Sequence, residues 1–262
     1  MLTALRPGLF DGTTVLITGG GSGIGLTTAL LMGGLGAQVA LCGRRSEPLE
    51  RAAAQLDERD ISVFTGICDI REPEAIETFV DGVIERFGGV QVLVNNAGGQ
   101  YPSPAKLISP KGFAAVVRNN LVGTWNMIHS VANKAMLDEG GGGCIINIIA
   151  QIKRGFPGMA HTGAARAGVD NLTKTLAVEW ASEGVRVNAI APGIIKSTGT
   201  ERYPPELLEL GRKATPAKRL GTPEEVAELI AFLSSPTADF ITGQTVYIDG
   251  GQSLWGDLWE ID

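Results

Sequence analysis

Seven short apolar runs alternate with longer segments of helical periodicity along almost the whole chain. The runs are continuously apolar rather than alternating with polar residues, which indicates strands covered on both faces and therefore a parallel sheet. This alternation predicts a doubly wound, three-layer α/β/α domain with ligands at the carboxyl ends of the strands. The expected strands are residues 14–17, 37–42, 61–66, 90–94, 144–149, 185–190 and 245–248. The expected helices are residues 24–34, 48–59, 73–87, 111–137, 169–182 and 223–234.

The composition fits one such domain, spanning residues 1–262, with 44% hydrophobic and 19% charged residues. The net charge of −6 gives no sign of a basic nucleic-acid face. No signal peptide or membrane-spanning run is recognisable, so the cytoplasm is the expected location. Cys42, Cys68 and Cys144 are expected to be buried, reduced thiols, and no cysteine or histidine pair has metal-ligand spacing.

A glycine-rich segment, T-G-G-G-S-G-I-G at residues 18–25, lies between the first expected strand and the first expected helix. Glycine permits a tight turn and lets the backbone approach a pyrophosphate, which the N–H groups of a helix N-terminus can hold. We therefore expect a dinucleotide site that includes Gly19, Ser22, Gly23, Ile24 and Gly25.

The end of the second expected strand distinguishes NADP from NAD. An aspartate there would hold the ribose hydroxyls of adenosine, but residues 42–45 read C-G-R-R. Two guanidinium groups without a carboxylate suit a 2′-phosphate. NADPH is therefore the expected cofactor, bound by Arg44 in preference to Arg45, and NAD is less favoured. The alternative is a pair of solvated arginines at the start of a helix.

The glycine spacing, N-N-A-G at residues 95–98 and P-G at residues 192–193 resemble the short-chain dehydrogenase/reductase family over nearly the whole chain. The resemblance implies a Rossmann-like, seven-stranded fold and a nicotinamide cofactor. It also implies that Asn120, within an expected helix, organises an active-site water. Further implied cofactor contacts are Asp69 and Ile70 near adenine, Asn95, Ala97 and Gly98, Pro192 and Gly193, Ile194 and Ile195 at the carboxamide, and Ser197 and Thr198 at the pyrophosphate.

The catalytic positions depart from that family as a set. The family's Tyr-x-x-x-Lys falls on Thr162 and Arg166, and Ala150 follows the fifth expected strand where the family usually has a serine nearby. A threonine hydroxyl is too weak an acid to replace tyrosine, and a guanidinium stays protonated. Arg166 still suits the hydroxyls of the nicotinamide ribose. Hydride delivery is therefore expected to persist without the usual proton relay to a carbonyl oxygen.

Four runs resemble a narrower branch, the peroxisomal trans-2-enoyl-CoA reductases, which lie near the 2,4-dienoyl-CoA reductases. These runs are N-N-A-G-G-Q at 95–100, I-N-I-I at 146–149, K-R-G-F-P at 153–157 and H-T-G-A-A-R-A-G at 161–168. The resemblance implies NADPH-dependent reduction of a carbon–carbon double bond conjugated to a thioester. That reaction needs a donor near the thioester oxygen and a proton for the α-carbon.

The sequence leaves the donor open among Thr162, Lys153, Tyr101, His161 and, through water, Asn120. Lys153 follows the fifth expected strand but is also readily a solvated lysine, and His161 is equally a packed neutral side chain. Two other functions stay open. One is a carbonyl or other C=X reductase with a relocated donor, and the other is an NADP-binding protein without catalysis.

Residues 197–221, rich in proline and charge, interrupt the alternation directly after the sixth expected strand. We expect a mobile substrate lid there, the alternative being an ordinary surface loop. Its Lys213, Lys218 and Arg219 either meet coenzyme A phosphates or form a solvated face. The family resemblance implies a homotetramer joined through helices 111–137 and 169–182 and the last strand. The apolar tail, residues 252–262, is expected to pack across a neighbouring subunit or close a pocket, and it carries no C-terminal S-K-L signal.

Overall fold

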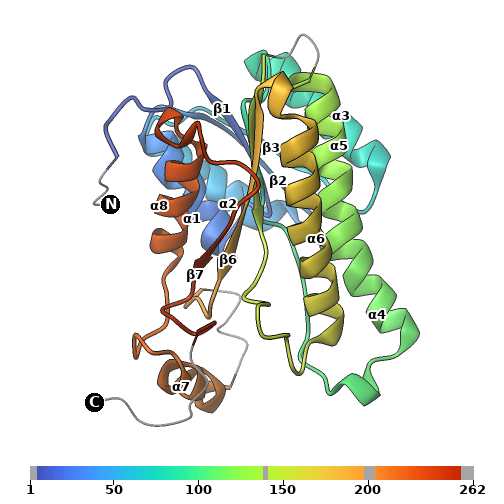
Figure 1. Ribbon diagram of the computed structural model, residues 1–262. Coiled ribbons are helices and arrows are strands. Elements are labelled where there is room, and N and C mark those ends of the chain that lie inside the picture. Colours follow the sequence, from blue (N-terminus) through green and yellow to red (C-terminus); the bar gives the residue numbers. More distant parts are fainter. Residues whose placement is uncertain (1–4, 138–140, 198–203, 255–262) are drawn as a thin grey trace.

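A seven-stranded, all-parallel sheet forms the centre of the molecule (Figure 1). The computed structural model describes residues 5–137, 141–197 and 204–254. The strands lie in the order β3-β2-β1-β4-β5-β6-β7, so the order reverses between β1 and β4, where doubly wound sheets bind ligands. The strands are β1 (Thr14–Thr18), β2 (Gln38–Gly43), β3 (Val63–Ile67), β4 (Val92–Asn95), β5 (Gly143–Ile148), β6 (Val185–Pro192) and β7 (Thr245–Ile248). The expected fold class is confirmed.

Helices cover both faces of the sheet (Figure 1). One face carries α1 (Gly23–Gly34), α2 (Ser46–Asp57) and α8 (Pro223–Ser234). The other carries α3 (Pro73–Phe87), α4 (Pro110–Val117), α5 (Gly123–Ala135) and α6 (Ala160–Glu179). Among the described residues, no helix is both long enough and apolar enough to cross a bilayer.

Strand side chains point alternately into two apolar layers. On β1, Val15 and Ile17 pack in the layer below α1 and α8, whereas Leu16 packs in the layer below α3 and α5. This alternation follows from the pleat of a strand, and it explains why the buried runs are continuously apolar. The sheet is therefore packed between two layers of helices. Residues at the carboxyl ends of its strands are held in fixed positions, where they can form a site.

The expected helix at residues 111–137 is interrupted. A π-helical turn, Arg118–Val122, separates α4 from α5. Inside it, the Nδ2 of Asn120 donates to the carbonyl oxygens of Val116 (3.0 Å) and Gly99 (2.7 Å). The Asn120 amide therefore joins the π-helical turn to the loop that follows β4, and such turns occur frequently at functional sites.

The helix expected at residues 169–182 begins earlier, at Ala160. Gly163 and Gly168 both lie within α6. A β-carbon on Gly163 would lie 3.0 Å from Phe156, and one on Gly168 would lie 2.8 Å from Leu121. Both glycines therefore permit close packing, and the helix carries Thr162 and Arg166 on its first turns.

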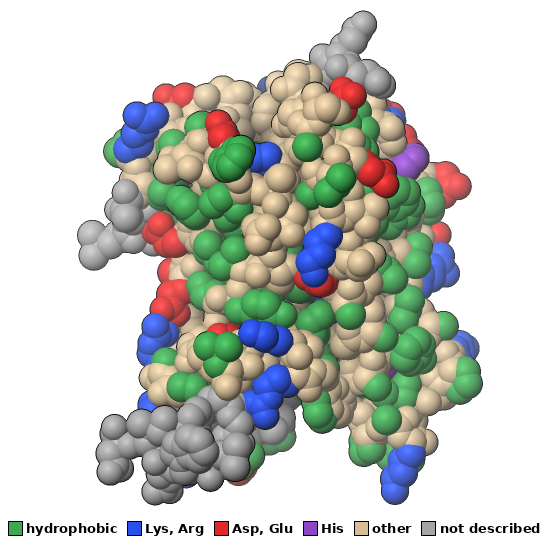
Figure 2. Space-filling view, viewed as in Figure 1, with side chains coloured by type: hydrophobic (Ala, Val, Ile, Leu, Met, Phe, Trp, Pro, Cys, Tyr) green, Lys and Arg blue, Asp and Glu red, His purple; other side chains and the backbone are tan. Residues whose placement is uncertain are grey.

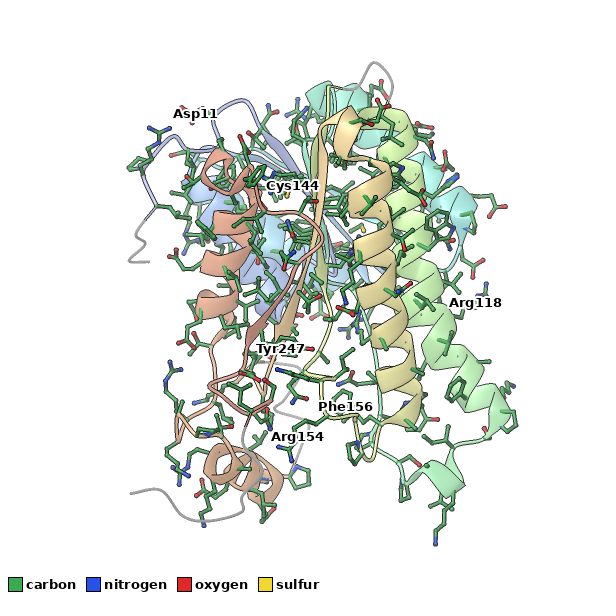
Figure 3. All side chains as sticks on the ribbon, viewed as in Figure 1. Asp11, Arg118, Cys144, Arg154, Phe156 and Tyr247 are labelled. Atoms are coloured by element: carbon green, nitrogen blue, oxygen red, sulfur yellow. The ribbon has the colours of Figure 1, made fainter. Side chains whose placement is uncertain are left out.

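The segment expected to be a substrate lid contains a helix, α7 (Pro205–Ala214), so these ten residues are not an irregular loop. The helix lies beyond the carboxyl ends of β6 and β7 (Figure 1). The loop from β5 to α6, which carries Arg154 and Phe156, reaches the same end of the molecule (Figure 3). Within the expected lid and tail, residues 198–203 and 255–262 lie outside the described residues.

Candidate active site

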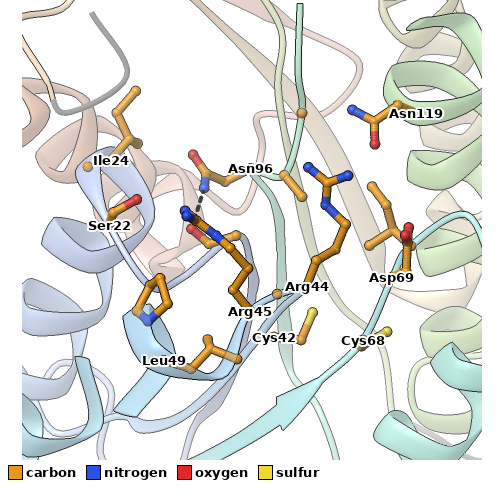
Figure 4. Close-up of a pocket in the computed structure, with 18 of the residues that line it drawn as sticks. Ser22, Ile24, Cys42, Arg44, Arg45, Leu49, Cys68, Asp69, Asn96 and Asn119 are labelled. Carbon is orange, nitrogen blue, oxygen red and sulfur yellow. Dashed lines mark hydrogen bonds between the residues drawn. The ribbon is translucent and has the colours of Figure 1, made fainter. Parts of the chain in front are cut away.

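A cavity of about 360 Å³ opens at the carboxyl ends of β1 to β4 (Figure 4). It collects eleven of the residues expected to bind a cofactor: Gly19, Ser22, Gly23, Ile24, Arg44, Arg45, Asp69, Ile70, Ala97, Gly98 and Ser197. It also has lining residues that the sequence analysis missed: Gly21, Cys42, Gly43, Pro48, Leu49, Cys68, Asn96 and Asn119. The cavity lies beside the reversal of strand order, as expected for a doubly wound sheet.

The turn between β1 and α1 fits a pyrophosphate. Gly19 has a φ of 67°, a left-handed conformation that favours glycine. A β-carbon on Gly21 would lie 2.9 Å from Pro48, so a side chain there would crowd the cavity wall. Ser22 is the N-cap of α1 and makes no side-chain capping hydrogen bond, which leaves the first helical N–H groups for an anion. Gly25 is buried in the helix and allows close packing on Gly19.

The hydroxyl of Thr18 organises the end of β4. It accepts the backbone N–H groups of Asn96 (3.0 Å) and Ala97 (2.9 Å). The Asn96 amide in turn donates to the carbonyl oxygens of Thr18 and Gly19. Of the two asparagines in N-N-A-G, it is therefore Asn96 that lines the cavity. The Asn95 side chain is buried and donates to Asn147 Oδ1 at 2.9 Å.

The end of the cavity beside β2 and β3 is strongly charged. Arg44 and Arg45 are exposed and extend from the end of β2 into the cavity (Figure 4). Asp69 is held by the guanidinium of Arg71, whose Nε donates to its two carboxylate oxygens at 2.9 and 3.1 Å. This hydrogen bonding lowers the pKa of Asp69, which therefore stays charged at neutral pH. Arg71 was not anticipated from the sequence.

All three cysteines are free and buried, as expected. Cys42 and Cys68 lie side by side in the cavity wall at the ends of β2 and β3 (Figure 4). A hydrogen bond to Cys68, together with burial, raises the pKa of the Cys42 thiol. This thiol therefore presents a neutral, apolar surface to the cavity.

Arg166 lies behind the loop that follows β4. Its side chain is only 6% exposed, and burial lowers its pKa to about 10. A β-carbon on Gly98 would overlap Arg166 Nη2 and would lie 2.8 Å from Asn120 Oδ1. Gly98 therefore lines the cavity and also lies against the Arg166 guanidinium and the Asn120 side-chain amide. The structure places both Asn120 and Arg166 close to Gly98.

Thr162, at the first turn of α6, is fully buried. Its backbone N–H donates to His161 Nδ1 at 2.8 Å, and its hydroxyl lies 3.3 Å from the same nitrogen. The His161 ring packs edge-on against Tyr101, with ring centroids 4.6 Å apart. Tyr101 itself is 42% exposed. Thr162, His161 and Tyr101 thus form one packed group beside the cavity rather than part of its lining.

The remaining expected site residues lie outside the main cavity. Lys153 is exposed in the loop between β5 and α6. Pro192 is buried at the end of β6, and Ile195 is buried just beyond it. Gly193 and Ile194 line a second cavity of about 110 Å³. Thr198 lies outside the described residues.

Comparisons with known proteins agree on one family. Residues 19–253 match the family model described as enoyl-(acyl carrier protein) reductase. A probable 2,4-dienoyl-CoA reductase of Bacillus subtilis is 39% identical, and the match covers 92% of this chain and 96% of the relative. The peroxisomal 2,4-dienoyl-CoA reductase of mouse is 35% identical, with 94% and 85% covered. Among solved structures, the citronellol catabolism dehydrogenase AtuB of Pseudomonas aeruginosa is 48% identical, with a TM-score of 0.87 over 96% of this chain and 99% of that one.

Proposed function

Because the chain belongs to the enoyl-(acyl carrier protein) reductase family of short-chain dehydrogenases/reductases, we propose that it uses NADPH to reduce the carbon–carbon double bond of 2-enoyl thioesters. Acyl-CoA thioesters are the proposed substrates, because several relatives carry dienoyl-CoA reductase names. Membership in the family makes the chain an oxidoreductase with a nicotinamide cofactor.

One observation carries the proposal: a cavity that suits a dinucleotide adjoins the position where the family has its tyrosine, and this chain has none there. The buried Thr162 stands there, with its hydroxyl against His161 Nδ1. Reduction of a ketone needs a proton on oxygen, which the usual tyrosine supplies. Reduction of an enoyl thioester puts hydride on the β-carbon and the proton on the α-carbon, so it has less need of that tyrosine.

Residues in and around the cavity suit the successive parts of NADPH. When bound, the cofactor supplies hydride, and the protein binds and orients it. The proposed binding residues are Gly19, Ser22, Gly23, Ile24 and Gly25 at the pyrophosphate; Arg44 and Arg45 at the 2′-phosphate; Asp69 and Ile70 at adenine; Asn95, Ala97 and Gly98 beside the nicotinamide half; Pro192, Gly193 and Ile195 at the carboxamide; Ser197; and Arg166 at the ribose. The proposed catalytic residues are Asn120, Thr162, Lys153 and Arg166.

We also propose a homotetramer. Exposed apolar side chains on α4 to α6, among them Phe113, Trp125 and Val178, support an interface there. Figure 2 shows apolar side chains gathered along the face over α5 and α6. The cytoplasm remains the proposed location.

A second candidate function is a reductase or dehydrogenase of small terpenoid alcohols or carbonyls. It is favoured by the 48% identity to the citronellol catabolism dehydrogenase. In that case a side chain other than Thr162 must supply the proton, and the contact of Tyr101 with His161 makes these two residues its first candidates.

A substrate panel separates the two functions. The purified protein is given NADPH with 2-enoyl-CoA and 2,4-dienoyl-CoA esters of increasing chain length, and with matched enals and ketones. We expect NADPH oxidation with the thioesters, a product heavier by two hydrogens, and transfer of deuterium from labelled NADPH to the β-carbon of 2-enoyl-CoA. Activity confined to the free carbonyl compounds would exclude the proposal. An Arg44→Gln variant should lose about 10–100-fold of the preference for NADPH over NADH, because charge-assisted hydrogen bonds contribute roughly 1.5–3 kcal/mol.

A further inference from the structure

Arg166 is a buried cation without a counterion. Its Nε and Nη1 atoms are enclosed and have no hydrogen-bond partner within the described part of the chain. No acidic side chain in those ranges forms an ion pair with it. A buried, unpaired charge is costly to maintain. The group is therefore expected to meet polar or anionic oxygens that arrive with the ligands.

The guanidinium reaches the cavity at Gly98. A β-carbon on Gly98 would overlap Nη2, so this nitrogen lies directly against a residue that lines the cavity. A guanidinium is planar and carries five N–H donors, so it can hold two oxygens on different edges. The ammonium of a lysine is a point charge and offers no such fork.

The other polar groups near Gly98 are mostly engaged. Asn120 Nδ2 donates to two carbonyl oxygens, and Asn120 Oδ1 accepts the backbone N–H of Gly99 at 3.2 Å. The Thr162 hydroxyl is buried beside His161 Nδ1. Lys153 is exposed in its loop. Among the described residues, His161 Nε2 is also buried without a hydrogen-bond partner, but of these two side chains it is Arg166 whose guanidinium lies against Gly98 in the cavity lining.

We propose that Arg166 is the oxyanion-holding residue of this enzyme: its guanidinium binds the substrate thioester oxygen as well as the nicotinamide ribose. The proposal rests on the proposed enoyl thioester reduction. It divides the two tasks of the missing tyrosine, assigning charge stabilisation to Arg166 and leaving proton delivery to solvent.

The reaction balances in two steps. Bound NADPH would supply hydride and be oxidised to NADP. As the new C–H bond formed at the β-carbon, the C=C π bond would break and its electron pair would place negative charge on the thioester oxygen beside Arg166, so that the substrate would be reduced. Water then gives a proton to the α-carbon, the thioester C=O re-forms, and the resulting hydroxide is neutralised by the buffer. Arg166 stays protonated throughout, which agrees with a pKa that burial lowers only to about 10.

The substrate class follows from this arrangement. Hydride addition to a saturated ketone concentrates the negative charge on one alkoxide oxygen, whereas the charge of an enolate is shared between the thioester oxygen and the α-carbon. The localised alkoxide depends more on a proton donated as it forms, which Arg166 does not supply. We therefore expect conjugated thioesters to react much faster than ketones of similar size.

The test compares Arg166→Lys, Arg166→Ala and the control Arg51→Lys, whose site is an exposed arginine on α2. Three quantities are measured: kcat with a 2-enoyl-CoA, the Kd of NADPH by fluorescence titration, and kcat of Arg166→Ala with added methylguanidinium or methylammonium. Arg166→Lys should keep the Kd within about threefold, because the lysine still donates to the ribose. Its kcat should fall about 100–1000-fold, the usual effect of losing an oxyanion donor. Methylguanidinium should restore Arg166→Ala by at least about tenfold, and methylammonium should not.

Two results overturn the inference. One is a kcat for Arg166→Lys within about threefold of the wild type, as in the control. The other is equal rescue of Arg166→Ala by both cations, or rescue by neither. A wild-type protein that binds NADPH but reduces none of the enoyl thioesters overturns the proposed function itself, and the inference with it. The wild-type measurement therefore separates the two kinds of failure.

Discussion

Replacing Arg166 with methionine should stabilise the protein in the absence of cofactor. Burial lowers the pKa of Arg166 to about 10, which corresponds to a penalty of about 3 kcal/mol on the charged side chain. Methionine is apolar and flexible, and it fills most of the same space. The smaller side chain leaves a cavity that costs about 1 kcal/mol. The net gain in the free energy of unfolding is therefore about 2 kcal/mol, or about 4–8 °C in Tm for a domain of this size.

The pH dependence of this effect has a definite sign. Because burial lowers the pKa of a cationic group, the folded state binds fewer protons than the unfolded state above pH about 10. The penalty is fully present below pH 10 and declines as the pH rises through that value. The advantage of Arg166→Met should therefore be constant from pH 6 to 9 and shrink in more alkaline solution.

Thermal and urea unfolding without cofactor measure the effect, with Arg51→Met as the control because surface substitutions usually change stability by less than about 0.5 kcal/mol. An Arg166→Met variant that unfolds at the same temperature as the wild type, or below it, would refute the reasoning. That outcome would mean that groups other than the described ones compensate the charge of Arg166.

Two further predictions concern the two ends of the cavity. Gly98→Ala should weaken NADPH binding by at least about tenfold, or 1.4 kcal/mol, because the new methyl group would overlap Arg166 Nη2; unchanged affinity in a fluorescence titration would contradict this. Arg71→Met should flatten the loss of stability in acid. The hydrogen bond from Arg71 lowers the pKa of Asp69, so the pair stabilises the fold above the ordinary carboxyl pKa of about 3.9 and loses this effect as the pH falls through the lowered value. Unfolding curves between pH 2 and 7 test it, and an acid limb as steep as that of the wild type would count against the pair.

The sheet and the cofactor cavity were predictable because their signals are local. Each buried strand is a continuous apolar run, and the turn after β1 needs glycine for conformation and close approach. The start of α6 was expected at residue 169, although the helix begins at Ala160. Gly163 and Gly168, in its first turns, have ordinary helical geometry and are small because Phe156 and Leu121 press against them. Leu121 is far from Gly168 in the sequence, so this packing leaves no pattern in the sequence around α6.

The sequence predicted which types of residue form the site, but it did not predict which of them face the cavity or contact one another. The N-N-A-G run marked the end of β4, yet only the structure distinguishes Asn96, which faces the cavity, from Asn95, which turns to Asn147. Arg71 follows Asp69 by two residues, but a charged pair at this spacing is common on any loop. Whether Arg166 forms an ion pair with a described acidic side chain depends on how the chain packs in three dimensions. The absence of such a pair could therefore not be predicted from the sequence alone.

The π-helical turn has a consequence for insertions and deletions. Successive residues of an α-helix are rotated by about 100°, and a π turn takes up one additional residue inside an otherwise α-helical segment. Before the turn Val116 faces inward, and after it Met127 and Val131 do. Deleting one residue from Arg118–Val122 should therefore convert the turn to α-helix and leave the inward faces of α4 and α5 in place. Inserting one residue within α5 has no such outlet and would rotate the rest of that helix by about 100° against the sheet, so the chain should tolerate the deletion far better than the insertion.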